Sequence, residues 1–151
     1  MLVEVVNWSS EWKRKSRRRV LSSPSTAHYI ADWPQADDLG VVAQVGNESV
    51  GAAWLRFFAA SRPGYGFVAA DTPELTIGVA TRWRGRGLGR ALLEAIEVRA
   101  LQADIKKISL NVERKNFAQK LYLAQGYHVL SPGYEGSDIM VKDLVGSHTR
   151  V

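Results

Sequence analysis

The residues of this chain with the clearest chemistry are three glycines that alternate with arginines in the run Arg84-Gly85-Arg86-Gly87-Leu88-Gly89-Arg90. The run separates a segment of strand-like alternation from a segment of helical periodicity. Glycine lets the backbone approach a ligand closely, and the unpaired N–H groups of a helix's first turn attract an anion. Because the arginines add positive charge, the run predicts a phosphate or pyrophosphate site. A glycine-rich turn without a ligand is the simpler alternative.

Two common nucleotide-binding motifs fail on spacing. A dinucleotide fingerprint, G-x-G-x-x-G, that starts at Gly85 would need glycine where Arg90 stands, and one that starts at Gly87 would need it at Leu92. A P-loop requires a lysine directly after its last glycine, and none of these glycines is followed by one. The predicted anion site therefore belongs to neither class.

The patterns on both sides of the glycine run predict the elements that position it. Leu75, Ile77 and Val79 alternate with smaller or polar residues, which predicts a strand over 75–80. Apolar residues recur every four positions over 88–103, as in a helix, and alternation returns over 108–112 as another strand. Such a strand–helix–strand unit makes a right-handed parallel crossover.

A second helix is expected to follow. Asn116 is a suitable N-cap, Gln119 would complete a capping box, and Gly126 would end the helix. Its core stripe is expected to be Phe117, Leu121 and Ala124. The other expected elements are a β-prone segment 2–6, helices 11–21 and 25–32, a hairpin of strands 41–45 and 50–58, a loop 61–66, and final strands 127–130 and 139–144.

Length and composition limit the class of protein. The 151 residues fit one domain, 1–151, and 46% hydrophobic with 23% charged residues is typical of a soluble globular protein. The absence of cysteine excludes disulfides, thiolate nucleophiles and cysteine-bound zinc, and no spacing suggests another metal site. With no apolar run long enough to span a bilayer and no secretory pattern at the N-terminus, we expect a cytoplasmic protein without a membrane partner.

The chain is basic, with a formal net charge of +5, and six of the seven residues from Lys13 to Arg19 are basic. Such a run can contact nucleic acid through its phosphates. No aromatic stacking motif or zinc-finger spacing accompanies it, so a solvated helix face is the simplest interpretation and nucleic acid is not the expected partner. A nucleic-acid-binding module is nevertheless kept as an alternative function.

Two motifs together resemble the GNAT superfamily of N-acetyltransferases. Arg84 to Gly89 matches that superfamily's coenzyme A signature, Q/R-x-x-G-x-G/A, and the stretch LNVERKNFAQKLYLAQGY at 110–127 resembles its segment ending in L-Y-x-x-x-G-F/Y. The resemblance covers about residues 74–144. It implies a GNAT-like mixed, mostly antiparallel sheet with a central splayed parallel strand pair, flanked by about four helices.

The resemblance also implies that acetyl-CoA is the co-substrate and lies between the two splayed strands. The pyrophosphate would bind the glycine loop, and the pantetheine arm would pair with the backbone of 77–79. Asn116 would contact the same arm or fix the splayed strand. The strand over 74–80 spans roughly 20 Å, which suits that arm. The implied cofactor-binding residues are Ile77, Gly78, Val79, Arg84, Gly85, Arg86, Gly87, Leu88, Gly89, Arg90, Asn116 and Tyr122.

The implied reaction is direct attack of a primary amine on the thioester. The amine must lose a proton, and Glu74 is the candidate base, with a water relay or a merely solvated carboxylate as alternatives. Tyr122 would protonate the departing sulfur; otherwise it is a core tyrosine. A backbone N–H near Val79 would stabilise the oxyanion. His28, His128 and His148 show no spacing that suggests a site.

The acceptor is not determined by the sequence. Small amines and protein amines both fit, and so does a non-catalytic acetyl-CoA sensor. A homodimer is compatible with the resemblance. Aromatic residues that could line an acceptor pocket, or belong to the core or surface instead, are Tyr29, Trp33, Trp54, Phe57 and Tyr65.

Overall fold

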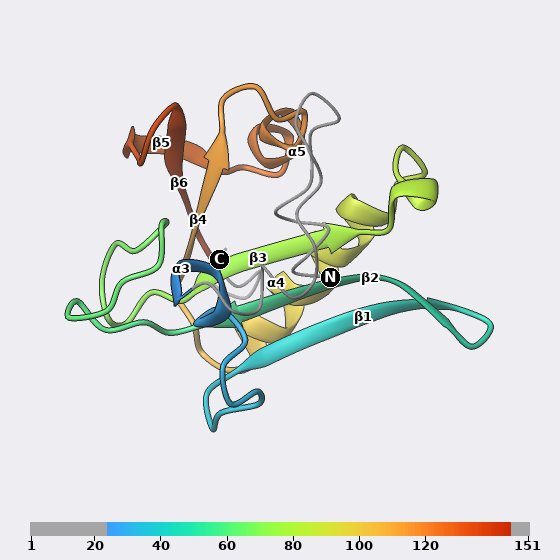
Figure 1. Cartoon of the computed structure of the whole chain (residues 1–151), viewed down its shortest axis with the longest axis horizontal. Coiled ribbons are helices and arrows are strands. Elements are labelled where there is room, and N and C mark those ends of the chain that lie inside the picture. The colour runs from blue at the N-terminus through green and yellow to red at the C-terminus, as the bar shows by residue number, and fades with distance from the viewer. Residues whose placement is uncertain (1–23, 146–151) are drawn as a thin grey trace, which may run out of the picture.

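A computed structural model describes residues 24–145, which form one six-stranded sheet with helices packed against it (Figure 1). The strand order is β1-β2-β3-β4-β6-β5, and every neighbouring pair is antiparallel except β3 and β4. The strands are β1 (Leu39–Val45), β2 (Glu48–Arg56), β3 (Glu74–Val79), β4 (Lys107–Glu113), β5 (His128–Pro132) and β6 (Ser137–Asp143). The predicted mixed sheet with a central parallel pair is confirmed.

The parallel pair separates almost as soon as it forms. Glu74 and Ser109 are the one residue pair in register between β3 and β4. Beyond that pair β4 turns away from β3 and joins β6 and β5, so that the sheet opens in the middle (Figure 1). Among the described strands, none consequently pairs with the β4-facing edge of β3 over most of its length.

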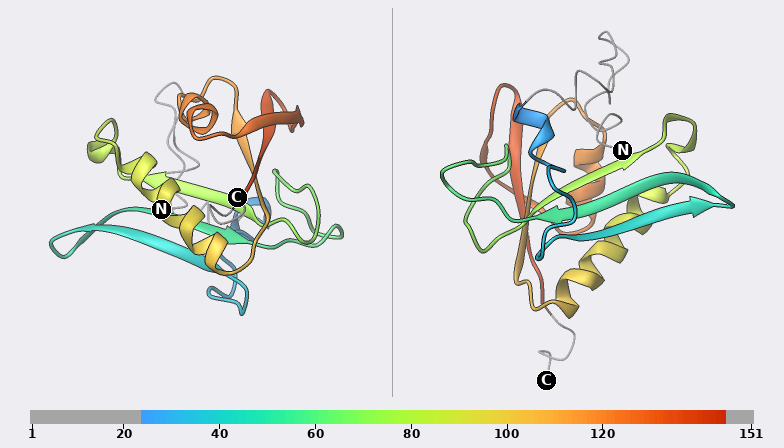
Figure 2. Two further views of the ribbon diagram at one scale, coloured as in Figure 1. Left: turned by 180° about the vertical axis from the view of Figure 1, so that it is seen from behind. Right: turned by 60° about the horizontal axis from the view of Figure 1, so that its bottom comes forward.

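The core lies between one face of the sheet and helix α4 (Leu88–Gln102), which crosses β1, β2 and β3 (Figure 2). The four-residue apolar period predicted over 88–103 explains this packing, because Leu92, Ile96 and Ala100 all point from α4 into the core. Opposite them lie buried aliphatic residues of four strands: Leu55, Leu75, Ile108, Leu110, Val112 and Met140. The crossover from β3 through α4 to β4 therefore holds the glycine run rigidly at the start of α4.

Each of the three helices expected in the described part of the chain is present, but two of them are shorter than expected. Besides α4 there is α5 (Ala118–Ala124), a single turn α3 (Pro24–Ala27) and the 3₁₀ turn η1 (Thr81–Trp83). The expected helix over 25–32 is thus only one turn, followed by further turns up to Pro34. The expected strand at 2–6, the helix at 11–21 and the basic run Lys13 to Arg19 lie outside the described residues.

The buried face of α5 differs from the expected one. Phe117 is 82% exposed and Ala124 is also exposed, whereas Tyr122 is buried and Ala118 and Leu121 pack against the core. The expected stripe was right for Leu121 and wrong for Phe117 and Ala124, because a helix of two turns can present more than one apolar face. Its contact with β4 selects the face.

The start of α5 also departs from the expected capping box. Asn116 does cap the chain there, since its Oδ1 accepts a 2.9 Å hydrogen bond from the Ala118 N–H. Gln119, however, does not reach back to Asn116. Its side-chain amide donates to Asp138 Oδ2 at 3.1 Å, on neighbouring β6. A tertiary partner has replaced the local one.

A buried ion pair fixes the turns before β1 onto the sheet. The guanidinium of Arg56 is 3.1 and 2.7 Å from the two carboxylate oxygens of Asp38, and it also donates to the carbonyl oxygens of His28 and Ala31. Both side chains are almost fully buried.

Within the described residues, no helix has the length and apolar character needed to traverse a lipid bilayer.

Candidate active site

A large cleft of about 1420 Å³ occupies the opening between β3 and β4. Its walls come from α3, β3, the glycine loop, β4, α5 and the loop between β5 and β6. The sequence-predicted residues that line it are Glu74, Ile77, Gly78, Val79, Arg84, Gly85, Gly87, Leu88, Gly89, Arg90, Asn116 and Tyr122. Residues from widely separated segments therefore meet around one cavity.

The glycine loop adopts a backbone that glycine favours. Gly85 and Gly87 have φ of 75° and 83°, and a Cβ on either would meet nothing within 4 Å. The first bond of α4 runs from the Ala91 N–H to the Gly87 carbonyl oxygen. Among the described residues, no backbone carbonyl accepts the N–H groups of 85–90. These donors and the positive end of α4 are suited to an anion.

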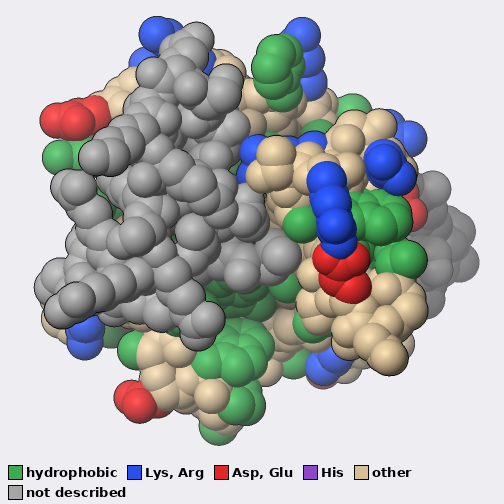
Figure 3. Space-filling model, turned by 45° about the vertical axis from the view of Figure 1, so that its right-hand side comes forward, with side chains coloured by type: hydrophobic (Ala, Val, Ile, Leu, Met, Phe, Trp, Pro, Cys, Tyr) green, Lys and Arg blue, Asp and Glu red, His purple; other side chains and the backbone are tan. Residues whose placement is uncertain are grey.

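The three arginines of the loop have different surroundings. Arg84 donates through Nε to the Val79 carbonyl oxygen at 3.1 Å, and Arg90 lines the cleft. Arg86 does not line the cleft: its guanidinium lies 4.8 Å from the ring centre of Trp83. Figure 3 shows basic side chains on the end of the molecule that carries the β1–β2 turn and this loop.

The free edge of β3 faces the cleft. The Ala80 N–H donates to Val50 on the β2 side, whereas the Pro73 carbonyl accepts from Ser109 on the β4 side. Because backbone groups alternate between the two edges of a strand, Ile77 directs its N–H and C=O toward the gap. These are the groups that an extended ligand could pair with.

Glu74 stands at the narrow end of the gap and is buried, with 3% of its surface exposed. Its Oε2 accepts a 2.6 Å hydrogen bond from the Tyr29 hydroxyl, and its Oε1 accepts from the Gly66 N–H at 3.0 Å. The Tyr29 oxygen in turn accepts from the Tyr65 N–H at 2.8 Å. Glu74 is therefore a held and desolvated carboxylate, and the alternative of a solvated one at the strand start is wrong.

Burial changes the proton affinity of this group. Desolvation raises the pKa of Glu74 from 4.5 to about 7, while the hydrogen bonds from Tyr29 and Gly66 lower it and so offset part of the rise. Burial beside the same carboxylate also raises the pKa of Tyr29. Near neutral pH, Glu74 can therefore both accept and release a proton, while Tyr29 stays a hydroxyl donor.

Two glycines let the loop before β3 close over Glu74. A Cβ at Gly64 would lie 2.2 Å from Glu74 Oε1 and 2.9 Å from the Tyr29 hydroxyl. A Cβ at Gly66 would lie 2.7 Å from the backbone carbon of Leu110. The loop and the splayed strands can approach this closely only because neither position carries a side chain.

Tyr122 is fixed by the end of α5. The Tyr127 N–H bonds to the Tyr122 carbonyl, and the N–H of Gly126, at φ 97°, bonds to Leu123; these two bonds make a Schellman motif, as Gly126 predicted. The rings of Tyr122 and Tyr127 are 5.8 Å apart. Burial raises the pKa of Tyr122. No other described residue hydrogen-bonds its hydroxyl, although the side chain lines the cleft.

The five candidate acceptor aromatics divide into two groups. Tyr29 and Tyr65 line the cleft. Trp54 packs beneath Tyr29 and Trp33 lies against Trp54, while Phe57 packs against the main core.

Sequence reasoning missed other residues of the cleft wall, among them Asn111, Glu113, Tyr134 and Glu135. The turn at 131–136 is visible in the sequence, but its position over β4 is not.

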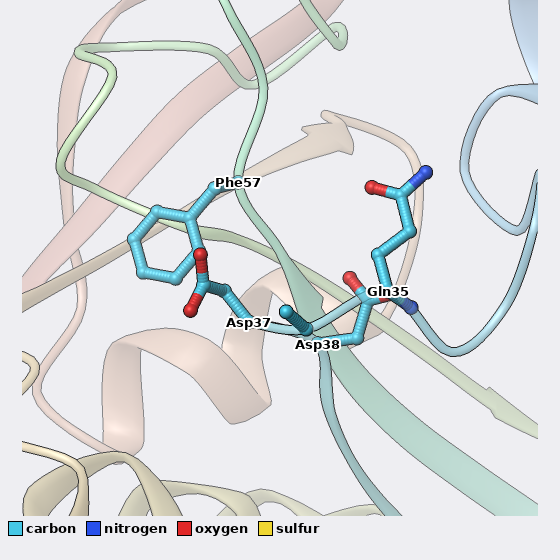
Figure 4. A pocket seen from close by; sticks show the side chains of 5 residues that line it. Gln35, Asp37, Asp38 and Phe57 are labelled. Atoms are coloured by element: carbon cyan, nitrogen blue, oxygen red, sulfur yellow. The ribbon is translucent and has the colours of Figure 1, made fainter.

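A smaller hollow of about 340 Å³ lies between the turn Gln35–Asp38 and Phe57 (Figure 4). One of its two carboxylates is already engaged, since Asp38 pairs with Arg56 and accepts from the Gln35 N–H at 2.7 Å. We therefore assign this hollow to the packing of the turn. Over 24–145, no group of three or more His, Asp or Glu could hold a metal ion.

Comparison with known proteins identifies the family. Residues 3–127 match the Acetyltransferase (GNAT) family. The chain belongs to this family of acetyltransferases. No curated protein matches the sequence closely enough to count as a relative.

Solved structures of GNAT proteins share the fold. The GNAT domain of S. lividans PAT superposes with a TM-score of 0.66 at 23% identity, over 88% of this chain and 72% of that one. A ribosomal-protein-alanine N-acetyltransferase from Brucella melitensis gives 0.57 at 29%, over 70% and 68%. The PaiA N-acetyltransferase from Thermoplasma acidophilum, solved with coenzyme A, gives 0.58 at 21%, over 71% and 61%. The chain thus spans about six tenths of the length of PaiA.

Proposed function

We propose that the chain is an acetyl-CoA-dependent N-acetyltransferase that transfers the acetyl group directly to a primary amine. One observation carries the proposal: a single cleft joins the unpaired N–H groups of the glycine loop to a buried carboxylate, Glu74, and a buried phenol, Tyr122. Family membership supports the same reaction class.

The residues of the cleft suit the coenzyme. The glycine loop offers open N–H donors and positive charge for a pyrophosphate, and the free backbone groups of Ile77 suit the amides of a pantetheine arm. When bound, the coenzyme supplies the activated acetyl group as a thioester. We propose that it is held by Ile77, Gly78, Val79, Arg84, Gly85, Gly87, Leu88, Gly89, Arg90, Asn116 and Tyr122, and by the backbone N–H of Arg86, whose side chain lies on Trp83 outside the cleft.

Glu74 is proposed as the base. Its raised pKa, about 7, lets it take a proton from an acceptor ammonium without being protonated permanently. Tyr29 and Gly66 hold the carboxylate in one orientation by bonding one oxygen each. Since each carboxylate oxygen has further acceptor capacity, Glu74 can still receive the proton directly or through one water.

Tyr122 is proposed as the acid. Its hydroxyl has no competing hydrogen bond to a described residue, and burial raises its pKa, so it remains protonated and available to the departing sulfur. The Val79 N–H, on the free edge of β3, is proposed to stabilise charge on the carbonyl oxygen. Overall the ammonium nitrogen gains the acetyl group and loses two protons. One goes to Glu74 before the attack, and the second, lost after it, balances the proton that the sulfur takes from Tyr122 as it leaves as the thiol.

Calorimetric titration with acetyl-CoA tests the cofactor site. Gly87→Glu places a negative charge on the anion site, and Gly87→Gln carries the same positive-φ strain without the charge. Gly46→Glu is a matched control, because Gly46 also has positive φ and open space but does not line the cleft. We expect tight binding by the wild type and Gly46→Glu, weaker binding by Gly87→Gln, and loss of binding by Gly87→Glu.

The outcomes separate the alternatives. A wild-type chain that does not bind acetyl-CoA would refute the proposal, and salt-sensitive binding to DNA or RNA would then favour the nucleic-acid module. Binding of acetyl-CoA without thiol release in an amine screen would indicate a sensor. Binding accompanied by thiol release that Glu74→Gln abolishes would establish the transferase.

A further inference from the structure

The basic and the acidic residues that line the cleft come from different elements. Among the described residues of its wall, the basic ones are Arg84 and Arg90, both in the glycine-loop region. The acidic ones are Glu74, Glu113 and Glu135, which come from β3, β4 and the loop between β5 and β6. A ligand with phosphates therefore suits one part of the cleft, and a ligand with positive charge suits the other.

A continuous chain of contacts links the buried carboxylate to the outer wall. Glu74 bonds to the Tyr29 hydroxyl, which bonds to the backbone N–H of Tyr65. The ring of Tyr65 lies 5.7 Å from the ring of Tyr134, and the next residue is Glu135. The two tyrosines are 39% and 62% exposed and both line the cleft, so a ligand there can reach them.

The loop that carries Tyr134 and Glu135 is held firmly. The Gly133 N–H bonds to the Ser137 carbonyl at 2.9 Å, and the Ser137 N–H bonds to the Tyr134 carbonyl at 3.1 Å. The Ser137 hydroxyl lies 2.8 Å from Asn111 Oδ1 on β4. Glu135 has a φ of 28°, which is uncommon for a residue other than glycine, and no described residue pairs with its carboxylate.

Two neighbouring tyrosine rings and a carboxylate that pairs with no described residue line the same cleft, and together they suit an alkylammonium group. A cation is attracted by the ring faces and by the carboxylate, and its aliphatic chain can pack along the rings. We propose that Tyr65, Tyr134 and Glu135 bind a second positive charge of the acceptor, so that the substrate class is a primary amine carrying another ammonium group, as in an aliphatic diamine or polyamine. This inference rests on the proposed acetyltransferase function.

The two charges of such an acceptor have different requirements. The nitrogen that reacts must lose its proton, and that proton goes to Glu74 in the proposed mechanism. The second nitrogen keeps its proton and serves only for binding. A monoamine would satisfy the first requirement and not the second, whereas an acidic acceptor would meet repulsion from Glu113 and Glu135.

Binding measurements test the proposal independently of turnover. The wild-type chain, saturated with coenzyme A, is titrated with 1,4-diaminobutane, with n-butylamine, and with a peptide whose first residues are acidic. We expect the diamine to bind about tenfold more tightly than the monoamine. Glu135→Gln and Tyr134→Ala should reduce that preference severalfold, while Tyr134→Phe, which keeps the ring, should retain it.

Glu94→Gln is the matched control, because Glu94 is exposed on α4 and does not line the cleft. This variant should behave as wild type. Equal affinity for the diamine and the monoamine, tighter binding of the acidic peptide, or an unchanged preference in Glu135→Gln would each overturn the inference. A wild-type chain that does not bind coenzyme A at all refutes the proposed function instead, so the two failures are distinguishable.

Discussion

The Tyr29 hydroxyl donates a 2.6 Å hydrogen bond to Glu74, a residue 45 positions later in the chain. This bond ties the turns before β1 to the narrow end of the β3–β4 gap. It also favours the ionised carboxylate, against the burial that favours the protonated one. The pair therefore sets the pH at which the proposed base can work.

Tyr29→Phe should move the pH dependence of the reaction. Removing the hydroxyl removes a bond to the ionised form of Glu74, so its pKa should rise further above 7. The acidic limb of kcat/KM should then shift to higher pH by about one pH unit. A rate–pH profile of both proteins measures this, and coincident acidic limbs would exclude Glu74 as the titrating base.

Stability should fall as Glu74 ionises. The pKa of Glu74 is about 7 in the folded chain against 4.5 ordinarily, so the carboxyl is protonated in both the folded and the unfolded chain below pH 4.5. There its contribution to the free energy of unfolding is fully present. It is lost as the pH rises through 7, by about 3 kcal/mol in all. Urea unfolding at pH 5 and pH 8 should show a smaller pH effect in Glu74→Gln. Parallel behaviour of the two proteins would contradict the burial of a titrating carboxyl.

Tyr122→Phe should separate catalysis from folding. Its hydroxyl bonds to no described residue, so removing it should change stability by less than about 1 kcal/mol. The loss of an acid should lower kcat by about 100-fold or more, with little change in acetyl-CoA affinity. Thermal unfolding, calorimetry and initial rates measure the three quantities. If Tyr122→Phe has the same kcat as the wild type, Tyr122 is a core residue and does not act as the acid.

Gly66→Ala should disturb both stability and the site. The added methyl would lie 2.7 and 2.8 Å from backbone atoms of Leu110 and Asn111, which cannot rotate away. We expect a loss of about 1–3 kcal/mol and a large loss of activity, since the Gly66 N–H holds Glu74. Gly136→Ala, where a Cβ meets nothing, controls for the loss of a glycine, although its φ of 74° adds strain. Equal stability of Gly66→Ala and wild type would show that the loop moves aside.

Asp38→Ala should be among the most destabilising changes at the edge of the sheet. It would leave the buried guanidinium of Arg56 without its carboxylate, at a cost of about 3–5 kcal/mol. Denaturant unfolding measures the change, with Asp37→Ala as a control because Asp37 is exposed. If the two variants are equally stable, water must replace the carboxylate at Arg56.

The sequence was most informative where the cause of structure is local. The alternation over 75–80 and the four-residue period over 88–103 correspond closely to β3 and α4. It failed on α5, where Phe117 was expected inside and is exposed. It also failed on Gln119, which prefers a partner on β6. In both cases several local arrangements have similar energy, and contacts with residues distant in the sequence determine which one forms.

The sequence by itself determined the glycine loop and the order of strands and helices around it, because periodicity and backbone conformation depend on neighbouring residues. The roles expected of Glu74 and Tyr122 came from the resemblance to the GNAT superfamily. Only the tertiary structure decided that Glu74 is buried against Tyr29, that the rings of Tyr65 and Tyr134 lie against each other, and that Glu135 lines the same cleft. Burial and hydrogen-bond partners depend on segments far apart in the chain. A pKa or a binding preference that follows from them therefore cannot be read from spacing alone.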